Sequence, residues 1–440
     1  MAVGWLWYAG FFTYPLIPAA AAAFAAAGAI LRWCRDGRTT ALIAAGMLTT
    51  IAALFRHDVG AYTALAILAA GIAPAPRPRG RAASIYLAVV LAGGLPFAAY
   101  LLASVPVAQL WEQLIIFPAS VYPAMRSLPF PDPIAALGDM TGAPADARLW
   151  AHRFPDLLLP LTPVVLAVAG ITGLLACLRR PDDTTDTAAR ARLLLGFLGL
   201  LLFAKGLVRP GVLHMLPAVL LVSPLLLSWA FPAAAVERGR IPPPWRWATS
   251  IAVAVFAIPP LAAGWNSLGS GEPTAHTLLG VEARYGASLP QGIPRARGFI
   301  VPADMAAAVR FVQARTAPDE PIFVALGRHD RVFVNDLLFY FLADRPPASR
   351  YVELHPGAVT EAAVQREIIT DLAASRPPYV IRWMAPPRRE PNASARSSGN
   401  SALDEFLDTE YRVVQELGEY RILARQGLAK SGITDQARRP

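Results

Sequence analysis

The sequence predicts an α-helical polytopic membrane protein of about eight spans with a C-terminal extracytoplasmic α/β domain. Its 440 residues are 55% hydrophobic and only 16% charged, which is too apolar for a soluble protein of this length. The hydrophobic residues gather in long runs up to residue 266, and beyond it the runs become short. We therefore predict a transmembrane domain over residues 1–266 and an extracytoplasmic domain over 267–440.

Eight apolar runs are long enough to cross about 30 Å of hydrocarbon. They are Leu16–Trp33, Thr39–Phe55, Val59–Ala75, Ala82–Ser104, Leu157–Leu178, Leu193–Val208, Val212–Phe231 and Trp247–Trp265. Arginines cluster in alternate loops between these runs, around Arg35, Arg79, Arg190 and Arg240. Because cytoplasmic loops are enriched in basic residues, the external loop 105–156 and the turn Arg209–Gly211 are predicted on the outer face.

The net charge of +9 does not indicate nucleic acid as a partner. Most arginines lie beside apolar runs, where they orient a chain in a membrane, so membrane lipid is the predicted partner. The preference for Ala, Arg, Gly and Pro over Lys and Asn is typical of a GC-rich bacterial genome. The predicted location is the bacterial inner membrane, with several passes across it.

One basic island lies between two apolar runs and contains Lys205, Arg209 and His214. Such side chains cost several kcal/mol in hydrocarbon unless they lie at its edge or meet an anion. Lys205 precedes the Arg209-Pro-Gly turn by about one helical turn and His214 follows it by about one. The three donors are therefore predicted to converge on one anion. The alternative is that the two cations reach lipid phosphates separately and His214 only packs between helices.

A short turn on the predicted outer face carries three ionisable side chains, Arg56-His57-Asp58. A carboxylate at a membrane surface can act as a general base, so Asp58 is the predicted catalytic residue. Arg56 is predicted to be a second phosphate contact. The alternative is a turn whose polar groups only bond to water and lipid headgroups.

The external loop 105–156 is too long for a simple connection, so it is a candidate roof over a binding site. Its ionisable residues Glu112 and Arg126 are the predicted substrate contacts. The stretch Gln109–Phe117 is predicted to form an interfacial helix. No regular element is expected over Tyr122–Pro131, which is rich in proline. A purely structural roof is the alternative.

Helices alternate with strands in the C-terminal part, which indicates a small α/β sheet. Helices are predicted over Ala303–Ala317, Val334–Leu342, Thr360–Ser375 and Leu403–Leu407, and strands over Ile322–Leu326, Tyr379–Trp383, Tyr411–Glu416 and Tyr420–Leu423. The polar turns Arg328–Arg331 and Leu354–Gly357 follow apolar segments, where active-site loops of such sheets lie. They are predicted either to contact a substrate headgroup or to be solvated surface.

Several catalytic motifs are missing from the sequence. It has no Gly-rich phosphate loop, no Cys/His cluster with zinc spacing, no His-Glu-x-x-His and no Gly-x-Ser-x-Gly elbow. The enzymes that depend on these motifs are excluded, and no metal ligands are predicted. Cys34 and Cys177 lie at arginine-rich ends of apolar runs, on the predicted reducing side, so no disulfide is expected.

Two groups of residues resemble a known family. The run Lys205-Gly-Leu-Val-Arg209-Pro-Gly-Val-Leu-His214 looks like the recurring Arg/Lys and His at an external helix junction of the polytopic GT-C glycosyltransferases. Bacterial members similar to protein mannosyltransferases and aminoarabinose transferases are the nearest in character. The segments Arg331–Tyr340, Pro346–Tyr351 and His355–Gly357 look like the periplasmic tail of some members.

The resemblance implies transfer of a sugar from a polyprenyl-phosphate donor to an acceptor on the outer face. The reaction would invert the sugar carbon and use an acidic residue as base, and metal use varies in the family, so a divalent metal is left open. Lys205 and Arg209 would hold the phosphate of this lipid-linked sugar donor, and His214 would donate a hydrogen bond.

The chain departs from the family at the catalytic carboxylate. In the family this group lies in the first external loop, whereas this chain begins with what looks like a later span. We therefore expect this chain either to be the later part of a longer protein or to have been given a start codon too late, so that the N-terminal catalytic loop is missing from it. Asp58 is a substitute candidate. Two other functions stay open: a transporter or flippase of a lipid-linked anion, and a non-catalytic membrane scaffold.

Overall fold

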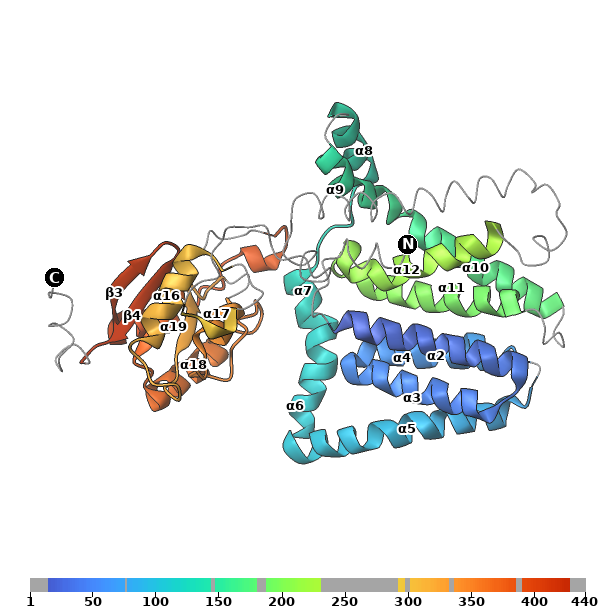
Figure 1. The fold of residues 1–440 in the computed structure, drawn as a ribbon, viewed down its shortest axis with the longest axis horizontal. Coiled ribbons are helices and arrows are strands. Elements are labelled where there is room, and N and C mark those ends of the chain that lie inside the picture. The colour runs from blue at the N-terminus through green and yellow to red at the C-terminus, as the bar shows by residue number, and fades with distance from the viewer. Residues whose placement is uncertain are drawn as a thin grey trace. The chain divides into compact units, whose positions relative to one another are not determined.

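The computed structural model describes residues 15–75, 77–143, 147–179, 187–230, 292–296, 301–331, 336–384 and 390–427. The chain divides into two compact units. The first, called the helical unit, consists of Met1–Glu112 and Pro129–Ser270. The second, called the sheet unit, consists of Gln113–Leu128 and Gly271–Pro440. Figure 1 shows that long helices make up the first and that a sheet with helices makes up the second.

Seven of the eight predicted apolar runs coincide with helices of the helical unit. Its elements are α2 (Leu16–Asp36), α3 (Thr39–Phe55), α4 (His57–Ala66), the π-helix η1 (Ile67–Ile72), α5 (Arg79–Ser104), α6 (Val107–Trp111), α8 (Pro133–Gly142), α9 (Ala147–Leu158), α10 (Leu161–Arg179), α11 (Thr187–Gly206) and α12 (Val212–Ala230). The eighth predicted run, Trp247–Trp265, lies outside the described residues.

Four described helices are long and apolar enough to cross a membrane. They are Leu16–Asp36, Arg79–Ser104, Arg153–Arg179 and Thr187–Gly206, with lengths of 21, 26, 27 and 20 residues. Three further apolar helices are shorter, namely Thr39–Phe55, His57–Ile72 and His214–Trp229. The predicted fold class is thereby confirmed in its coarse form: the chain is mostly helical, has apolar helices of membrane-spanning length, and carries a small C-terminal sheet.

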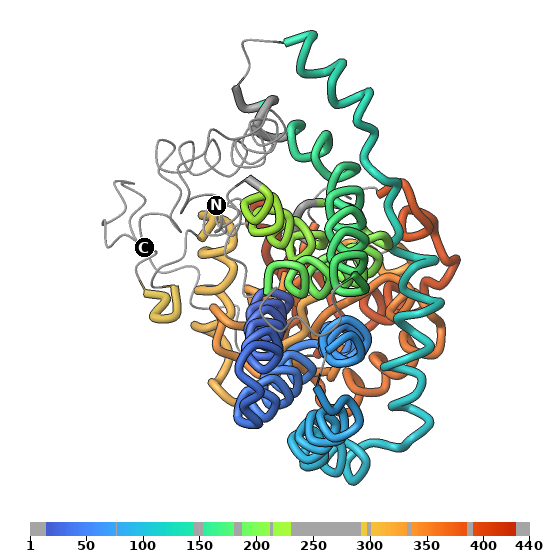
Figure 2. Tube along the Cα trace, turned by 90° about the vertical axis from the view of Figure 1, so that its right-hand side faces the viewer, coloured from blue at the N-terminus to red at the C-terminus, as the bar shows by residue number. Residues whose placement is uncertain are grey.

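Small residues let the helices of the helical unit approach closely. A Cβ at Gly173 of α10 would lie 2.4 Å from the backbone nitrogen of Leu193 in α11, and one at Gly196 would lie 2.6 Å from the nitrogen of Gly170. Without side chains at these positions, the backbones of α10 and α11 touch, as in helix pairs of membrane proteins. Figure 2 views these packed helices from one end.

The sheet unit contains four strands in the order β1-β2-β4-β3. The strands are β1 (Phe323–Leu326), β2 (Tyr379–Trp383), β3 (Tyr411–Leu417) and β4 (Tyr420–Arg425). β1 and β2 are parallel, and β4 is antiparallel to both β2 and β3. The carboxyl ends of β1 and β2 therefore lie at one edge of the sheet.

Helices cover both faces of this sheet. On one face, α16 (Ala303–Gln313) and α17 (Leu337–Ala343) bury Val324 of β1. On the other face, α18 (Ala362–Ser375) and α19 (Ala402–Glu410) bury the neighbouring Phe323. Alternate residues of a strand point to opposite faces, so each strand contributes to both apolar cores. The predicted C-terminal helices and strands are all present, with ends shifted by a few residues.

The expectation for Tyr122–Pro131 is wrong at its N-terminal half. Tyr122–Arg126 forms the short helix α7, which follows the π-helix η2 (Glu112–Val121). Pro123 occupies the first turn of α7, where its missing N–H would have had no helical partner anyway. The predicted interfacial helix over Gln109–Phe117 appears as α6 followed by the start of η2.

Candidate functional site

Asp58 and Arg56 meet at the corner between α3 and α4. Arg56 has an extended backbone, with φ −152° and ψ 110°, which ends α3 and starts α4 one residue later. Its Nε and terminal nitrogen donate to the two carboxylate oxygens of Asp58 at 3.0 and 2.8 Å. A guanidinium fits a carboxylate in this bidentate way. The Val59 N–H also donates to the carboxylate at 2.8 Å, and an acidic group at a helix N-terminus is favoured by the helix dipole.

Lys205 joins this pair from the last turn of α11. Its ammonium nitrogen lies 3.9 Å from a carboxylate oxygen of Asp58. The side chains of Lys205, Asp58 and Arg56 are 12%, 22% and 26% exposed, so the three groups are largely shielded from solvent. We call these three residues the ion cluster. It holds two cations for one carboxylate and therefore carries excess positive charge.

Arg209 and His214 lie on the hairpin that follows Lys205. The Arg209 N–H donates to the Gly206 carbonyl oxygen at 3.1 Å, which closes a turn over residues 206–209, just before the predicted turn Arg209–Gly211. A Cβ at Gly206 would lie 3.3 Å from the carbonyl oxygen of His214, so the two arms of the hairpin pack tightly. Arg209 and His214 are both partly buried. Convergence of their side chains with Lys205 on one anion stays a prediction.

The two candidates from the external loop 105–156 belong to different units. Glu112 is exposed and ends the first segment of the helical unit. Arg126 is a residue of the sheet unit, where it is buried and lies 3.7 Å from the carboxylate of Glu390. The structure therefore gives Arg126 a carboxylate partner inside the sheet unit.

The polar turn Arg328–Arg331, predicted as a possible headgroup contact, makes structural bonds. His329 is fully buried. Its Nε2 accepts from the Leu326 N–H at 3.2 Å, and its Nδ1 lies 2.8 Å from an oxygen of Asp404. Nε2 therefore carries no proton, and the Nδ1–H group donates to the Asp404 carboxylate. Both nitrogens are used within the protein, so His329 fastens α19 to the end of β1.

Asp330 in the same turn fastens a second segment. Its carboxylate accepts from the Arg328 guanidinium and from the Ser397 hydroxyl, and these hydrogen bonds lower the pKa of Asp330 to about 2. Burial opposes ionisation of Asp404, but hydrogen bonds from His329 and the nearby Arg382 outweigh it, so the pKa of Asp404 is also lowered. In the other polar turn, His355 pairs with Glu353 at 2.6 Å.

The surroundings of Asp58 do not suit a divalent metal ion. Such ions prefer several oxygen ligands, whereas the Asp58 carboxylate already meets two positive side chains. Within the described parts of the chain, no group of three or more His, Cys, Asp or Glu side chains is arranged to hold a metal. Two cations beside one carboxylate are a combination suited to an anionic group.

No protein-family model, no curated protein and no solved structure matches the chain. The family resemblance therefore rests on the residues of this sequence alone. Glu390 and Asp404, the partners of Arg126 and His329, were not singled out from the sequence. Neither residue lies in a recognisable motif, and each meets its partner only through folding.

Proposed function

We propose that the chain is a multi-pass protein of a bacterial plasma membrane, with about eight spans and the sheet unit on the extracytoplasmic side. The arrangement of arginines in the helical unit supports this placement. Arg77 donates to the carbonyl oxygens of Cys34 and Arg35, and Arg190 donates to that of Pro74. Basic residues from three parts of the chain thus meet at one end of the helices, as expected for a cytoplasmic face.

The ion cluster lies toward the other end of the same helices. α4 and η1 run from Asp58 toward Pro74, and α11 runs from Arg190 toward Lys205. In the proposed orientation, the ion cluster faces the outer leaflet. A partly buried site with excess positive charge is suited to a phosphate carried by a lipid, because a low dielectric strengthens the attraction.

The proposed activity is transfer of a sugar from a polyprenyl-phosphate donor to an acceptor hydroxyl on the outer face. The single observation that carries it is the contact of both Arg56 and Lys205 with Asp58. Two cations that could bind a phosphate thus lie beside one potential base. Negative charge develops on the phosphate as the bond to the sugar breaks, and fixed cations stabilise that charge.

The bidentate contact with Arg56 stabilises the charged form of the Asp58 carboxylate, so Asp58 is a weak base while this contact lasts. We infer that the donor phosphate draws Arg56 and Lys205 away from the carboxylate. Asp58 then takes the proton of the acceptor hydroxyl while the hydroxyl oxygen attacks the sugar carbon. The bond between this carbon and the phosphate breaks, and polyprenyl phosphate leaves. Donor binding and exposure of the base are thus one event.

The experiment that tests this proposal uses the full chain in proteoliposomes with a polyprenyl-phosphate sugar labelled in the sugar. Formation of a labelled glycoside and appearance of the labelled lipid in the other leaflet are measured in the same sample. Glycoside formation that depends on Asp58 supports sugar transfer. Movement of the labelled lipid to the other leaflet without formation of a glycoside would contradict sugar transfer and support the transporter function.

Arg32→Gln provides a matched control for loss of a cation. Arg32 pairs with Asp36 at 3.5 Å in the last turn of α2, and its side chain is 60% exposed. Arg32→Gln removes one positive charge, as Arg56→Gln does, but it leaves the ion cluster unchanged. An equal loss of activity in both variants would contradict a role for Arg56 in binding the donor.

A further inference from the structure

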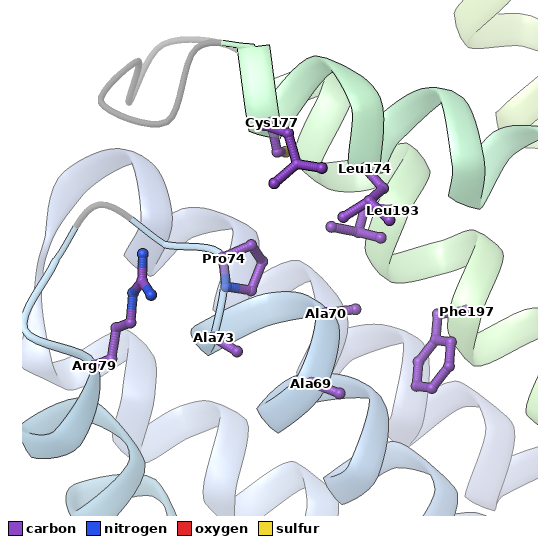
Figure 3. A pocket seen from close by; sticks show the side chains of 10 residues that line it. Ala69, Ala70, Ala73, Pro74, Arg79, Leu174, Cys177, Leu193 and Phe197 are labelled. Atoms are coloured by element: carbon purple, nitrogen blue, oxygen red, sulfur yellow. The ribbon is translucent and has the colours of Figure 1, made fainter.

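The helical unit also contains an apolar cavity of about 400 Å³. Figure 3 shows Ala69, Ala70 and the following turn on one side, facing Leu174, Cys177 and Phe197 of α10 and α11. Phe197 precedes Lys205 by about two turns of α11, or roughly 12 Å. The cavity is therefore separate from the ion cluster and lies toward the arginine-rich end of the helices.

The π-helix η1 explains why this space exists. The part of η1 that borders the cavity consists of Ala69 and Ala70. Their side chains are too short to fill the space toward α10 and α11. Wider π-helical turns are often found at functional sites. At Gly71, η1 packs against both neighbours, since a Cβ there would lie 2.7 Å from Ile30 of α2 and 3.8 Å from Leu194 of α11. The space borders Ala69 and Ala70 instead.

Among the described residues that line the cavity, one is charged, namely Arg79 at the start of α5. Its Nε donates to the Ala75 carbonyl oxygen at 3.1 Å, which fixes the guanidinium next to the turn that borders the cavity. This bond uses one of the five N–H donors of an arginine. The Arg190 guanidinium is bonded to the Pro74 carbonyl of the same turn. Positive charge is thus gathered at one edge of an otherwise apolar space.

We propose that this cavity binds one acyl chain of an anionic phospholipid, with the lipid phosphate at Arg79. The apolar walls suit a hydrocarbon chain, and the arginine edge suits an anionic headgroup. A helix of a partner protein is too large an occupant for this cavity. A helix fills roughly 400–600 Å³ in each turn of 5.4 Å at its diameter of 10–12 Å, so the cavity would admit a single turn only. The inference rests on the proposed membrane placement and does not depend on sugar transfer.

The test is native mass spectrometry of the full chain, purified in mild detergent and mixed with phosphatidylglycerol or phosphatidylcholine. The wild-type chain is expected to retain one lipid, with about a tenfold preference for phosphatidylglycerol. Ala69→Phe fills the cavity from an exposed position and is expected to lose both lipids. Ala92→Phe adds the same ring to an exposed position of α5 and is expected to retain the lipid.

Arg79→Gln is expected to abolish the headgroup preference while one lipid is still retained. Arg81→Gln, which removes an exposed arginine outside the cavity, is expected to keep the preference. Equal retention by the wild-type chain and Ala69→Phe would overturn the proposal. An equal loss of preference in Arg79→Gln and Arg81→Gln would overturn the headgroup assignment in favour of a general basic surface.

A second measurement needs no variant. Phosphatidylglycerol with a photoreactive group in its acyl chain is added to the wild-type chain, and the cross-linked peptides are identified. Labels on 174–178 of α10 and 193–197 of α11 support the cavity. Labels found only on exposed residues of α5 would contradict it.

Discussion

The ammonium group of Lys205 and the carboxylate of Asp58 lie 3.9 Å apart, and this contact links the end of α11 to the start of α4. Because both side chains are largely shielded, Asp58→Asn leaves the Lys205 ammonium group without this counter-charge, whereas Lys205→Met leaves the Asp58 carboxylate paired with Arg56 alone. Asp58→Asn and Lys205→Met are each expected to lower the thermal stability of the chain in micelles. The double variant is expected to be more stable than the sum of the single effects implies, by about 0.5–3 kcal/mol. Strict additivity would show that the contact contributes nothing.

His329 is expected to stabilise the sheet unit. Its side chain is fully buried and bonded at both nitrogens, so His329→Ala leaves a cavity and removes a hydrogen bond from Asp404. We expect a loss of about 3 kcal/mol in the free energy of unfolding. His355→Ala is the control, since the His355 side chain is 37% exposed, and we expect a change within about 0.5 kcal/mol. Denaturant unfolding measures both, and similar losses would contradict the structural role of His329.

The lowered pKa of Asp330 predicts acid sensitivity of the sheet unit. A carboxyl with a pKa of about 2 when folded and about 3.9 when unfolded stabilises the folded state above pH 4. That contribution is lost as the pH falls from about 4 to about 2. Asp330→Asn should therefore be less stable at pH 6 and lose less on acidification. Unfolding curves recorded from pH 6 to pH 2 provide the measurement, and parallel curves for the two proteins would contradict the expectation.

Gly357 is expected to hold the segment 113–128 on the rest of the sheet unit. It has φ of +81°, and a Cβ there would lie 2.9 Å from Met125 and 3.1 Å from Val121. Gly399 has a similar φ of +78° with open space around it. Both changes to Ala add backbone strain of about 1–2 kcal/mol, but only Gly357→Ala also forces α7 and η2 to shift.

Hydrogen exchange separates the two effects of these glycine variants. Peptides from 113–128 are expected to exchange faster in Gly357→Ala than in Gly399→Ala at equal overall stability. The same exchange rate in both variants would show that the close approach at Gly357 does not hold this segment.

The sequence allows the apolar helices to be predicted because length and hydropathy are local properties. The predicted apolar run Thr39–Phe55 has the same first and last residues as the helix α3. A high proline content predicts no helix over Tyr122–Arg126, but Pro123 lies in the first turn of α7, where proline is compatible with a helix. The C-terminal helices and strands followed from their periodicity, as for Tyr379–Trp383.

The site was only partly accessible from the sequence. Arg56, Asp58 and Lys205 were each recognisable as charged residues beside apolar runs. Their mutual contact depends on how α4 packs against α11, which no local pattern specifies. The partnership of Arg126 with Glu390 has the same origin, since these residues meet only in the folded sheet unit.

The most direct test of the central claim is the rate of sugar transfer by Lys205→Met in proteoliposomes, relative to wild type at equal amounts of folded protein. If the ion cluster stabilises the departing phosphate, the rate falls by about 10²–10³, as when one stabilising group is removed from other active sites. Lys205→Arg, which keeps the charge, retains more of the activity. An unchanged rate in Lys205→Met would contradict the account.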